Sequence, residues 1–415
     1  MTRAVAAARP VLDPARLASV DLADPRLHAE HDLTRLWRHL RDEDPVHWHE
    51  RPGRPGYWVI TRHADVMAVY RDAERFTSER GNVLDTLLAG GDSAAGKMAA
   101  VTDGPRHAEL RGVLLRAFTP RALDAVVARM TAAAGELVAT AVAAGECDFA
   151  TDVAARIPLA VICDLLGVPA GDRAEILRLT SSALASDDGT PAELAAWSVR
   201  NEILLYFADL AQVRRNSPHD DLVSLLVTSR VAGRPLTAEE VVFNCYSLVL
   251  GGDETTRYSM IGGLNAFIEE PEQWRRFTAG EVAPEQAVEE ILRWTTPTLH
   301  AGRTATADAV LGGRLVEAGD LVTVWNVAGN LDERQFADPG RFDVGRTPNK
   351  HLTFAYGPHF CLGAHLARQE LGAVLAALRD QVGAVRANGP QRRVYSNFLS
   401  GLSSLPVVLT PRRAA

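Results

Sequence analysis

Cysteine, lysine and long apolar runs are all scarce in this chain. Its four cysteines, Cys147, Cys163, Cys245 and Cys361, show no paired spacing and no Cys-x-x-Cys. A disulfide framework is therefore not indicated, and a reducing cytoplasm fits this usage. No stretch approaches the roughly 18 uninterrupted apolar residues that a membrane-spanning helix needs. Because arginines, prolines and aspartates break the alanines of the first 20 residues, we predict neither a membrane anchor nor a cleaved signal peptide.

Positive charge is also limited. The formal net charge is −8, which argues against general nucleic-acid binding because that function needs a basic surface. Lys97 and Lys350 are the only lysines, so arginine carries almost all of the positive charge. What the chain does have is 415 residues, 47% of them hydrophobic and 23% charged. That composition is enough for the sizeable core of a globular protein.

Helical patterns dominate the chain, and β structure is predicted at two places. Residues 1–25 are rich in proline and are predicted to be irregular. The predicted strands are 56–60, a hairpin over 309–316 that turns at Gly312-Gly313, and 321–325. The predicted amphipathic helices are 63–70, 123–142, 192–216 and 363–382. The chain shows no internal repeat and no low-complexity linker.

The most informative segment surrounds Cys361. Phe354 lies seven residues before it, Gly357 four before it and Gly363 two after it. Glycines let a backbone loop pass close under a flat macrocycle without Cβ clashes, and a thiolate is a strong electron donor to iron. The segment continues as a helix, whose N-terminal dipole stabilises a negative sulfur. Cys361 is therefore predicted to be an iron ligand, with a buried free thiol beside a turn as the alternative.

This segment resembles the haem-binding signature of the cytochrome P450 family, Phe-x-x-Gly-x-x-x-Cys-x-Gly, at all four fixed positions. By motif the resemblance runs from about Asp103 to the C-terminus, and more loosely from Trp58. It implies a single, mainly α domain over residues 1–415, with many helices and small β-sheets. A haem b would be buried between a long central helix and the cysteine loop, with Phe354 and Gly363 beside it.

A very long helix is predicted after Leu236. Thr237 and Glu240 form a capping box, and the apolar pattern continues to Glu270, about 50 Å at 1.5 Å per residue. Halfway along it lies the segment Gly251-Gly252-Asp253-Glu254-Thr255-Thr256, in which the two glycines cost about 1 kcal/mol each relative to alanine. Glycine leaves space where a ligand approaches a helix, and a threonine hydroxyl can bond back to the preceding turn. A helix boundary is the alternative interpretation.

The resemblance assigns roles to this segment, because it matches the family's oxygen-binding groove. It implies that Gly252 approaches the cofactor, that Thr255 orients oxygen and its waters, and that Glu254 feeds protons from solvent. Cys245, on the same helix, is interpreted as a core residue.

A Glu-x-x-Arg motif occurs at Glu290 and Arg293. The same spacing recurs at Glu175–Arg178, Glu254–Arg257 and Glu272–Arg275, and most such pairs are ordinary solvated helix faces. The resemblance selects Glu290 by its position before the cysteine and implies Arg341 as a third member. A buried network of this kind would hold the cysteine loop.

Haem carries two propionates, which need cationic donors. Four side chains match the family's positions for this role: His107, Arg111, Arg303 and His359. His107 and Arg111 lie four apart, on one helical face. A surface charge is the alternative for each, and His365 is interpreted as an ordinary helix residue.

The resemblance places the substrate pocket between four segments, residues 83–100, 247–251, 296–301 and 398–402. They mix apolar residues with glycines and hydroxyls, and their candidate recognition charges are Asp85, Asp92, Lys97 and His300. An apolar or aromatic substrate of small to medium size is favoured.

The resemblance implies a cytoplasmic, monomeric haem-thiolate monooxygenase of specialised metabolism. It would insert one oxygen atom from O2 into a small molecule, either free or bound to a carrier protein. No nucleotide-binding turn is present, so electrons would come from an external ferredoxin and an NAD(P)H-dependent reductase. The ferredoxin would dock near the cysteine, where five cations could gather: Arg106, Arg116, Arg346, Lys350 and Arg368.

Two other functions remain open, and a third is easily dismissed by experiment. The same scaffold could catalyse oxidative coupling or ring closure without net oxygen insertion. A haem sensor or carrier without turnover is disfavoured by Glu254 and Thr255, because a carrier needs no proton relay. A cysteine hydrolase that pairs Cys361 with His365 or His359 would lack the spectrum of a thiolate-bound haem.

Overall fold

The computed structural model describes residues 9–180 and 193–413. Its helices are α1 (Pro25–Glu30), α2 (Thr34–Glu43), α3 (His63–Arg71), α4 (Leu84–Leu88), α5 (Gly104–Leu115), α6 (Pro120–Ala144), α7 (Arg156–Leu166), α8 (Arg173–Thr180), α9 (Glu193–Asn216), α10 (Leu222–Thr228), α11 (Ala238–Glu269), α12 (Pro271–Thr278), α13 (Pro284–Thr295), α14 (Asn326–Gly329) and α15 (Ala364–Gln381). The predicted helix at 192–216 corresponds to α9, and Ala192 itself lies outside the described residues.

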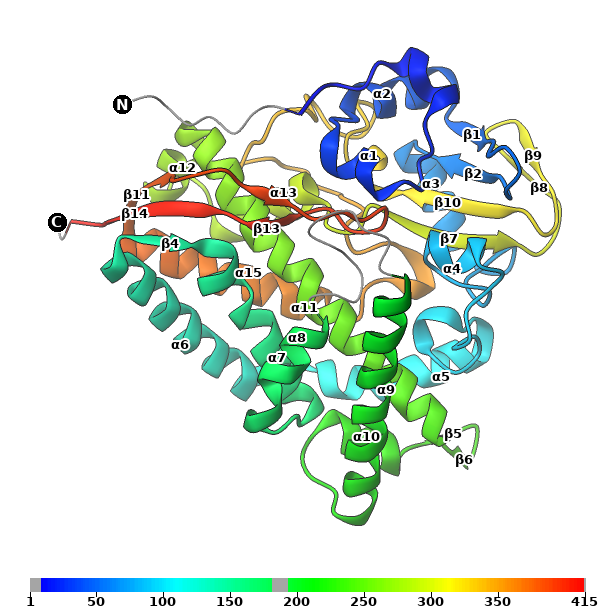
Figure 1. The fold of residues 1–415 in the computed structure, drawn as a ribbon, viewed down its shortest axis with the longest axis horizontal. Coiled ribbons are helices and arrows are strands. Elements are labelled where there is room, and N and C mark those ends of the chain that lie inside the picture. Colours follow the sequence, from blue (N-terminus) through cyan, green and yellow to red (C-terminus); the bar gives the residue numbers. More distant parts are fainter. Residues whose placement is uncertain (1–8, 181–192, 414–415) are drawn as a thin grey trace.

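The strands form one larger sheet and several small ones. They are β1 (Val46–His49), β2 (Tyr57–Ile60), β3 (Phe76–Thr77), β4 (Glu146–Asp148), β5 (Arg230–Val231), β6 (Arg234–Pro235), β7 (His300–Ala305), β8 (Ala309–Leu311), β9 (Arg314–Val316), β10 (Leu321–Trp325), β11 (Val382–Ala387), β12 (Arg392–Arg393), β13 (Leu402–Ser404) and β14 (Pro406–Pro411). The five-stranded sheet has the order β1-β2-β10-β7-β3. It lies at the opposite end of the molecule from α9 and α10 (Figure 1).

Helix α11 is the central element. It begins at the predicted capping box, where Glu240 N donates to Thr237 Oγ1 (3.2 Å) and Thr237 N donates to Glu240 Oε2 (2.8 Å). Its 32 residues span about 48 Å, and the helix runs diagonally across the molecule (Figure 1). The Gly251-Gly252 pair lies inside the helix and not at a boundary, so the alternative of a helix stop is wrong.

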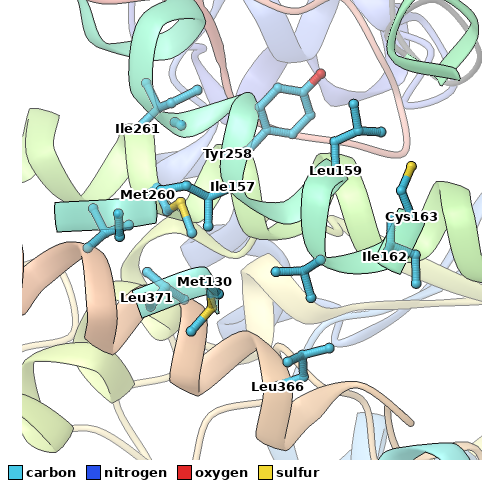
Figure 2. Packing of buried hydrophobic residues seen from close by; sticks show 14 of the residues in the cluster. Met130, Ile157, Leu159, Ile162, Cys163, Tyr258, Met260, Ile261, Leu366 and Leu371 are labelled. Carbon is cyan, nitrogen blue, oxygen red and sulfur yellow. The ribbon is translucent and has the colours of Figure 1, made fainter. Parts of the chain in front are cut away.

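The main core fills the space between α6, α7, α11 and α15. Figure 2 shows Met130 of α6 and Leu371 of α15 close to Ile157 of α7 and Met260 of α11. Cys245 is fully buried in this core, as predicted. By length and composition α6 is apolar enough to cross a membrane, and most of its residues are not buried, but one face packs along α15 and α7.

The structure corrects two predictions of secondary structure. The N-terminal residues are not all irregular, because Pro14–Ser19 form a 3-10 helix whose first turn is capped by the Asp13 carboxylate. β structure also occurs at three further places, where β14 pairs with both β11 and β4, β12 pairs with β13, and β5 pairs with β6. The predicted strands at 56–60 and 321–325 and the hairpin at 309–316 are confirmed.

Candidate functional site

A cavity of about 350 Å³ lies between α11 and the cysteine loop. Each of the four segments predicted for the substrate pocket contributes residues to its wall, among them Ala99, Ser247, Thr298 and Phe398. Its lining is mostly apolar. This composition suits a flat cofactor together with a largely apolar substrate.

The cysteine loop is shaped by its backbone. Cys361 N donates to Phe354 O at 2.9 Å, which closes the loop on itself. Gly357 has φ +71°, and a Cβ at this position would lie 2.4 Å from Tyr70 O, so only glycine fits. A Cβ on Gly363 would meet only Phe118 Cε1, at 4.0 Å. This leaves the space beside the sulfur open.

Cys361 lines the cavity at the start of α15. Burial raises the pKa of its thiol, whereas the Gly363 N–H and the cations Arg111 and Arg368 act in the opposite direction. These groups are the ones that would stabilise a thiolate bound to a metal. Arg368 also forms a cation–π contact with Phe354, with its Cζ 4.5 Å from the ring centroid, and it pairs with Glu289. Phe354 is thereby fixed against the cysteine loop.

The middle of α11 forms the opposite wall. Gly251, Gly252 and Thr255 line the cavity, and Thr255 Oγ1 donates to Gly251 O at 2.9 Å. A Cβ on Gly251 would meet nothing within 4 Å, whereas one on Gly252 would lie 3.1 Å from Ile162 of α7. Gly251 therefore leaves the cavity open, and Gly252 is also needed for packing between helices.

Glu254 lies next to this wall and is completely buried. Its Oε1 contacts Arg257 at 3.3 Å and accepts from the Tyr258 hydroxyl at 3.2 Å, while Oε2 has no partner among the described residues. Burial raises the pKa of Glu254 to about 8, although Arg257 opposes the shift. The carboxyl group is therefore poised to hold or release a proton near neutral pH.

The predicted propionate ligands come together on one wall of the cavity, and all four line it. Arg303 is 3% exposed, and no carboxylate of the described chain forms a salt bridge with it. Its Nη1 donates to Gly302 O, and its guanidinium lies 5.5 Å from the centre of the Tyr70 ring. A buried, uncompensated guanidinium is costly, and an anionic ligand in the cavity would offset that cost.

The two histidines stack on each other. The ring centroids of His107 and His359 are 4.2 Å apart, and His359 Nε2 lies 2.6 Å from Asp103 Oδ1. Burial lowers the pKa of His107 to about 4, assisted by the positive charges of His359 and Arg111. Arg111 Nη2 donates to Phe360 O at 2.6 Å and so joins α5 to the cysteine loop.

The Glu290–Arg293 pair is buried and bidentate, with both N···O distances at 2.8 Å. The prediction that Arg341 is the third member is wrong. The third cation is Arg346, whose Nε donates to Glu290 Oε2 at 3.0 Å. Arg341 is exposed and contributes its backbone carbonyl, which accepts from Arg293 and Arg346. The Glu-x-x-Arg spacing therefore predicted the Glu290–Arg293 pair. It could not predict the third member, because that residue depends on the path of an irregular loop.

Several cavity residues were not predicted from the sequence, and Glu370 is the acidic one among them. Glu370 lines the cavity on the face of α15 that carries Gly363, Leu366 and Ala367. It is 3% exposed, and its Oε2 has no partner among the described residues. Burial raises its pKa well above the usual value, with Asp253 acting in the same direction. A charged residue on the apolar face of the helix was the signal that could have revealed it.

The expected recognition charges of the pocket lie elsewhere. His300 is fully buried between Trp325 and Phe398, and its Nε2 accepts from Leu84 N. Lys97 pairs with Glu239 on the surface. Asp85 accepts from Asn397, and Asp92 lies 3.9 Å from Arg200. The pocket is therefore less charged than the sequence suggested.

These features fit a haem. A cysteine stands at one wall, glycines leave room on both sides, and a buried guanidinium faces the cavity with no carboxylate salt bridge from the described chain. Comparison with known proteins agrees. The cytochrome P450 family model matches residues 284–378. This match and two relatives that align over nearly the whole chain show that the chain belongs to the cytochrome P450 family, whose members are haem-dependent oxidoreductases.

Two relatives and one solved structure show how far the similarity extends. The chain is 49% identical to cytochrome P450 NovI of Streptomyces niveus, over 97% of this chain and 99% of the relative. It is 32% identical to a steroid C26-monooxygenase of Mycolicibacterium smegmatis, over 94% of this chain and 93% of that protein. It superposes on the crystal structure of P450 OxyD, involved in the biosynthesis of vancomycin-type antibiotics, with a TM-score of 0.86 and 34% identity, covering 95% of this chain and 100% of the other.

Proposed function

We propose that the protein is a monooxygenase that inserts one oxygen atom from O2 into a small to medium, apolar or aromatic molecule of specialised metabolism. The observation that carries this proposal is that Thr255 and Cys361 line the same mostly apolar cavity, with the buried Glu254 next to Thr255 on α11. A relative involved in antibiotic biosynthesis supports the metabolic setting. The whole chain, residues 1–415, would form one domain.

The cavity side chains would have separate roles in the reaction. Cys361 would hold the iron, and Arg303, Arg111, His107 and His359 would bind the propionates. When bound, the haem supplies the oxidation chemistry. The Thr255 hydroxyl, already directed by Gly251 O, would orient a water in the cavity. Glu254 would hold the proton that this water delivers, because its raised pKa lies near the working pH.

We propose that electrons come from a ferredoxin and an NAD(P)H-dependent reductase. Three of the five arginines and lysines predicted for docking are already engaged within the protein. Arg106 pairs with Glu240, Arg346 binds Glu290, and Arg368 pairs with Glu289. Arg116 and Lys350 remain as candidates. The docking surface would then lie between the start of α6 and the segment that leads into the cysteine loop.

The remaining features are also proposals. The protein would act as a cytoplasmic monomer, without nucleic acid or membrane, on a substrate that is free or attached to a carrier protein. Product analysis distinguishes oxygen insertion from coupling or ring closure.

The carbonyl spectrum of the reduced protein tests the haem-thiolate assignment. Wild type should show the Soret band typical of thiolate ligation, and Cys361→Ala should lose it. Cys245→Ala is the matched control, because this thiol is buried in the core. A thiolate-type spectrum in Cys361→Ala would contradict the whole assignment.

A further inference from the structure

The segment between α4 and α5 packs as a unit of its own. We name residues 92–101 the cover segment. Its Ala94, Met98 and Val101 form a small buried cluster, against which Phe243 of α11 packs. The backbone N–H groups of Lys97 and Met98 both donate to Ala94 O, and Gly96 N donates to Val101 O. The segment therefore keeps its shape through its own contacts.

The two ends of the cover segment differ. Gly90 and Gly91 precede it with φ +97° and +134°, conformations that glycine adopts without strain. At the other end, Asp103 is fixed by hydrogen bonds from Thr77 and Ser78. The glycine end offers a place where the backbone can turn, and the Asp103 end is held to the body of the protein.

Asn244 joins the cover segment to α11. It is 1% exposed, and its Nδ2 donates to Lys97 O (2.9 Å) and Glu240 O (2.6 Å). Its Oδ1 accepts from Ala99 N at 3.0 Å. The Asn244 carboxamide thus uses both of its N–H donors and its oxygen acceptor in hydrogen bonds with backbone groups. Two of these three backbone groups belong to the cover segment.

These bonds act directly on the cavity wall. Ala99 and Ala100 of the cover segment line the cavity, as does Asn244. Two other polar contacts of the segment are more exposed: Lys97 with Glu239 (2.9 Å) and Arg200 with Ser93 (3.1 Å). One further contact is buried, where Thr102 Oγ1 donates to Met98 O (2.8 Å) at the Asp103 end. Exposed ion pairs and hydrogen bonds contribute little to stability, whereas leaving a buried donor or acceptor without a partner is energetically costly.

We propose that Asn244 is a positioning residue that latches the cover segment over the substrate cavity, and that breaking this latch controls the entry and exit of small molecules. The segment moves as a unit about Gly90-Gly91, because its internal bonds do not depend on Asn244. The inference rests on the proposed function only in taking this cavity as the place where substrate binds.

Ligand-binding kinetics test the latch. Phenylimidazole, an aromatic probe that binds haem iron, is mixed with the holoprotein, and its association and dissociation rates are followed by absorbance. Asn244→Ala should raise both rates by about tenfold, with a smaller change in Kd, since the open and closed positions exchange more easily. Asn265→Ala is the matched control: it lies on the same helix and bonds only Glu269 within the helix. Its rates should equal those of wild type.

Hydrogen exchange tests the same idea without turnover. The Ala99 amide, which donates to Asn244, should exchange faster in Asn244→Ala, while the Lys97 and Met98 amides keep their protection because they donate to Ala94 O. Asn244→Asp keeps an acceptor for Ala99 but loses both donors, so its exchange should be intermediate. This second variant covers the case in which Asn244→Ala fails to fold.

Two results would overturn the latch. Binding rates and Ala99 exchange equal to wild type would mean that Asn244 does not hold the segment. Loss of protection at Lys97 and Met98 as well would mean that the segment unravels instead of moving as a unit. Failure of the proposed function is distinguishable, because it shows as a missing thiolate-type carbonyl spectrum, whereas amide exchange needs neither electrons nor substrate.

Discussion

Two adjacent residues of α11 have different surroundings. Thr255 lies on the cavity wall with its hydroxyl directed to Gly251 O, and Glu254 lies on the next face against Arg257 and Tyr258. Helical residues one position apart point about 100° away from each other. In the proposed mechanism, a proton from Glu254 would therefore have to travel around the helix to reach the cavity. Thr255 is the residue at which this path would meet the substrate side.

Thr255→Ala should separate electron uptake from product formation. Binding of substrate and reduction need no proton from Thr255, so both should persist. Proton delivery to oxygen should fail, which lowers product formation by about 100-fold. Reductant would still be consumed, and peroxide would appear instead of product. Measuring product, peroxide and reductant together gives the coupling ratio.

The controls for this experiment keep the local geometry. Thr255→Ser retains the hydroxyl and should restore most of the coupling. Thr140→Ala is the second control. Thr140 Oγ1 donates to Glu136 O at 2.9 Å on the exposed face of α6, which is the same kind of bond to a carbonyl one turn earlier. Its removal should leave the coupling ratio unchanged. Equal coupling in wild type and Thr255→Ala would show that protons reach the cavity by another route.

At the scale of elements, the cysteine loop depends on a network beside α13. Glu290 accepts from Arg293, Arg346, Asn349 Nδ2 and the Asp343 N–H. Arg293 Nη1 also donates to the carbonyls of Asn330 and Pro339. One helix thus fixes the irregular segment that leads into the loop.

Arg346→Ala should destabilise the protein, whereas Arg341→Ala should not. Glu290 is 0% exposed, and without Arg346 its buried negative charge keeps only Arg293 as a cationic partner. Breaking a buried ion pair in this way lowers the free energy of unfolding by about 3 kcal/mol. Arg341 is exposed, and surface substitutions usually change the free energy of unfolding by less than about 0.5 kcal/mol. Denaturant titration of the two variants decides the matter. A larger effect from Arg341→Ala would restore the sequence-based prediction.

The elements that could be predicted from the sequence are those with local signals. The capping box of Thr237 and Glu240 correctly predicted the start of α11, and Gly312-Gly313 correctly predicted the β8–β9 turn. Phe354 and Gly357 located the cysteine loop, because glycine spacing reflects close approach of backbones. In each case the residues that carry the signal also make the contact.

Features that depend on distant parts of the chain were missed. β14 pairs with β4, about 260 residues away, and neither short strand carries a strong pattern of its own. Arg346 replaces Arg341 because the loop after Asp338 turns back on Glu290, and spacing alone does not show such a turn. Glu370 was overlooked because its importance comes from the cavity it faces.

At the scale of the whole molecule, a buried aromatic stack supports the five-stranded sheet. His28 stacks on Trp325 (5.5 Å between ring centroids), and His300 lies against the same indole at 4.9 Å. Burial, with the charge of His28 second, lowers the pKa of His300 to about 3. Burial lowers the pKa of His28 to about 4. Both rings are therefore neutral at neutral pH in the folded protein.

These histidines should make the protein sensitive to mild acid. In the unfolded chain they titrate near pH 6.5, so between pH 6.5 and about 4 the unfolded state binds more protons than the folded state. The histidine contribution to the free energy of unfolding is therefore complete above pH 6.5. It falls as pH falls, by up to about 1.4 kcal/mol per pH unit for each histidine.

The comparison of wild type with His300→Gln isolates this contribution. Glutamine keeps an acceptor for Leu84 N but does not titrate. Glu254 and Glu370, whose pKa values are raised, act in the opposite sense over part of this range but are present in both proteins. Carboxylates with lowered pKa values, such as Asp21 and Asp103, act below about pH 4. The difference in the free energy of unfolding, measured by denaturant titration at several pH values, should therefore shrink steadily from pH 6.5 to 4. A constant difference would mean that His300 is not buried as a neutral ring.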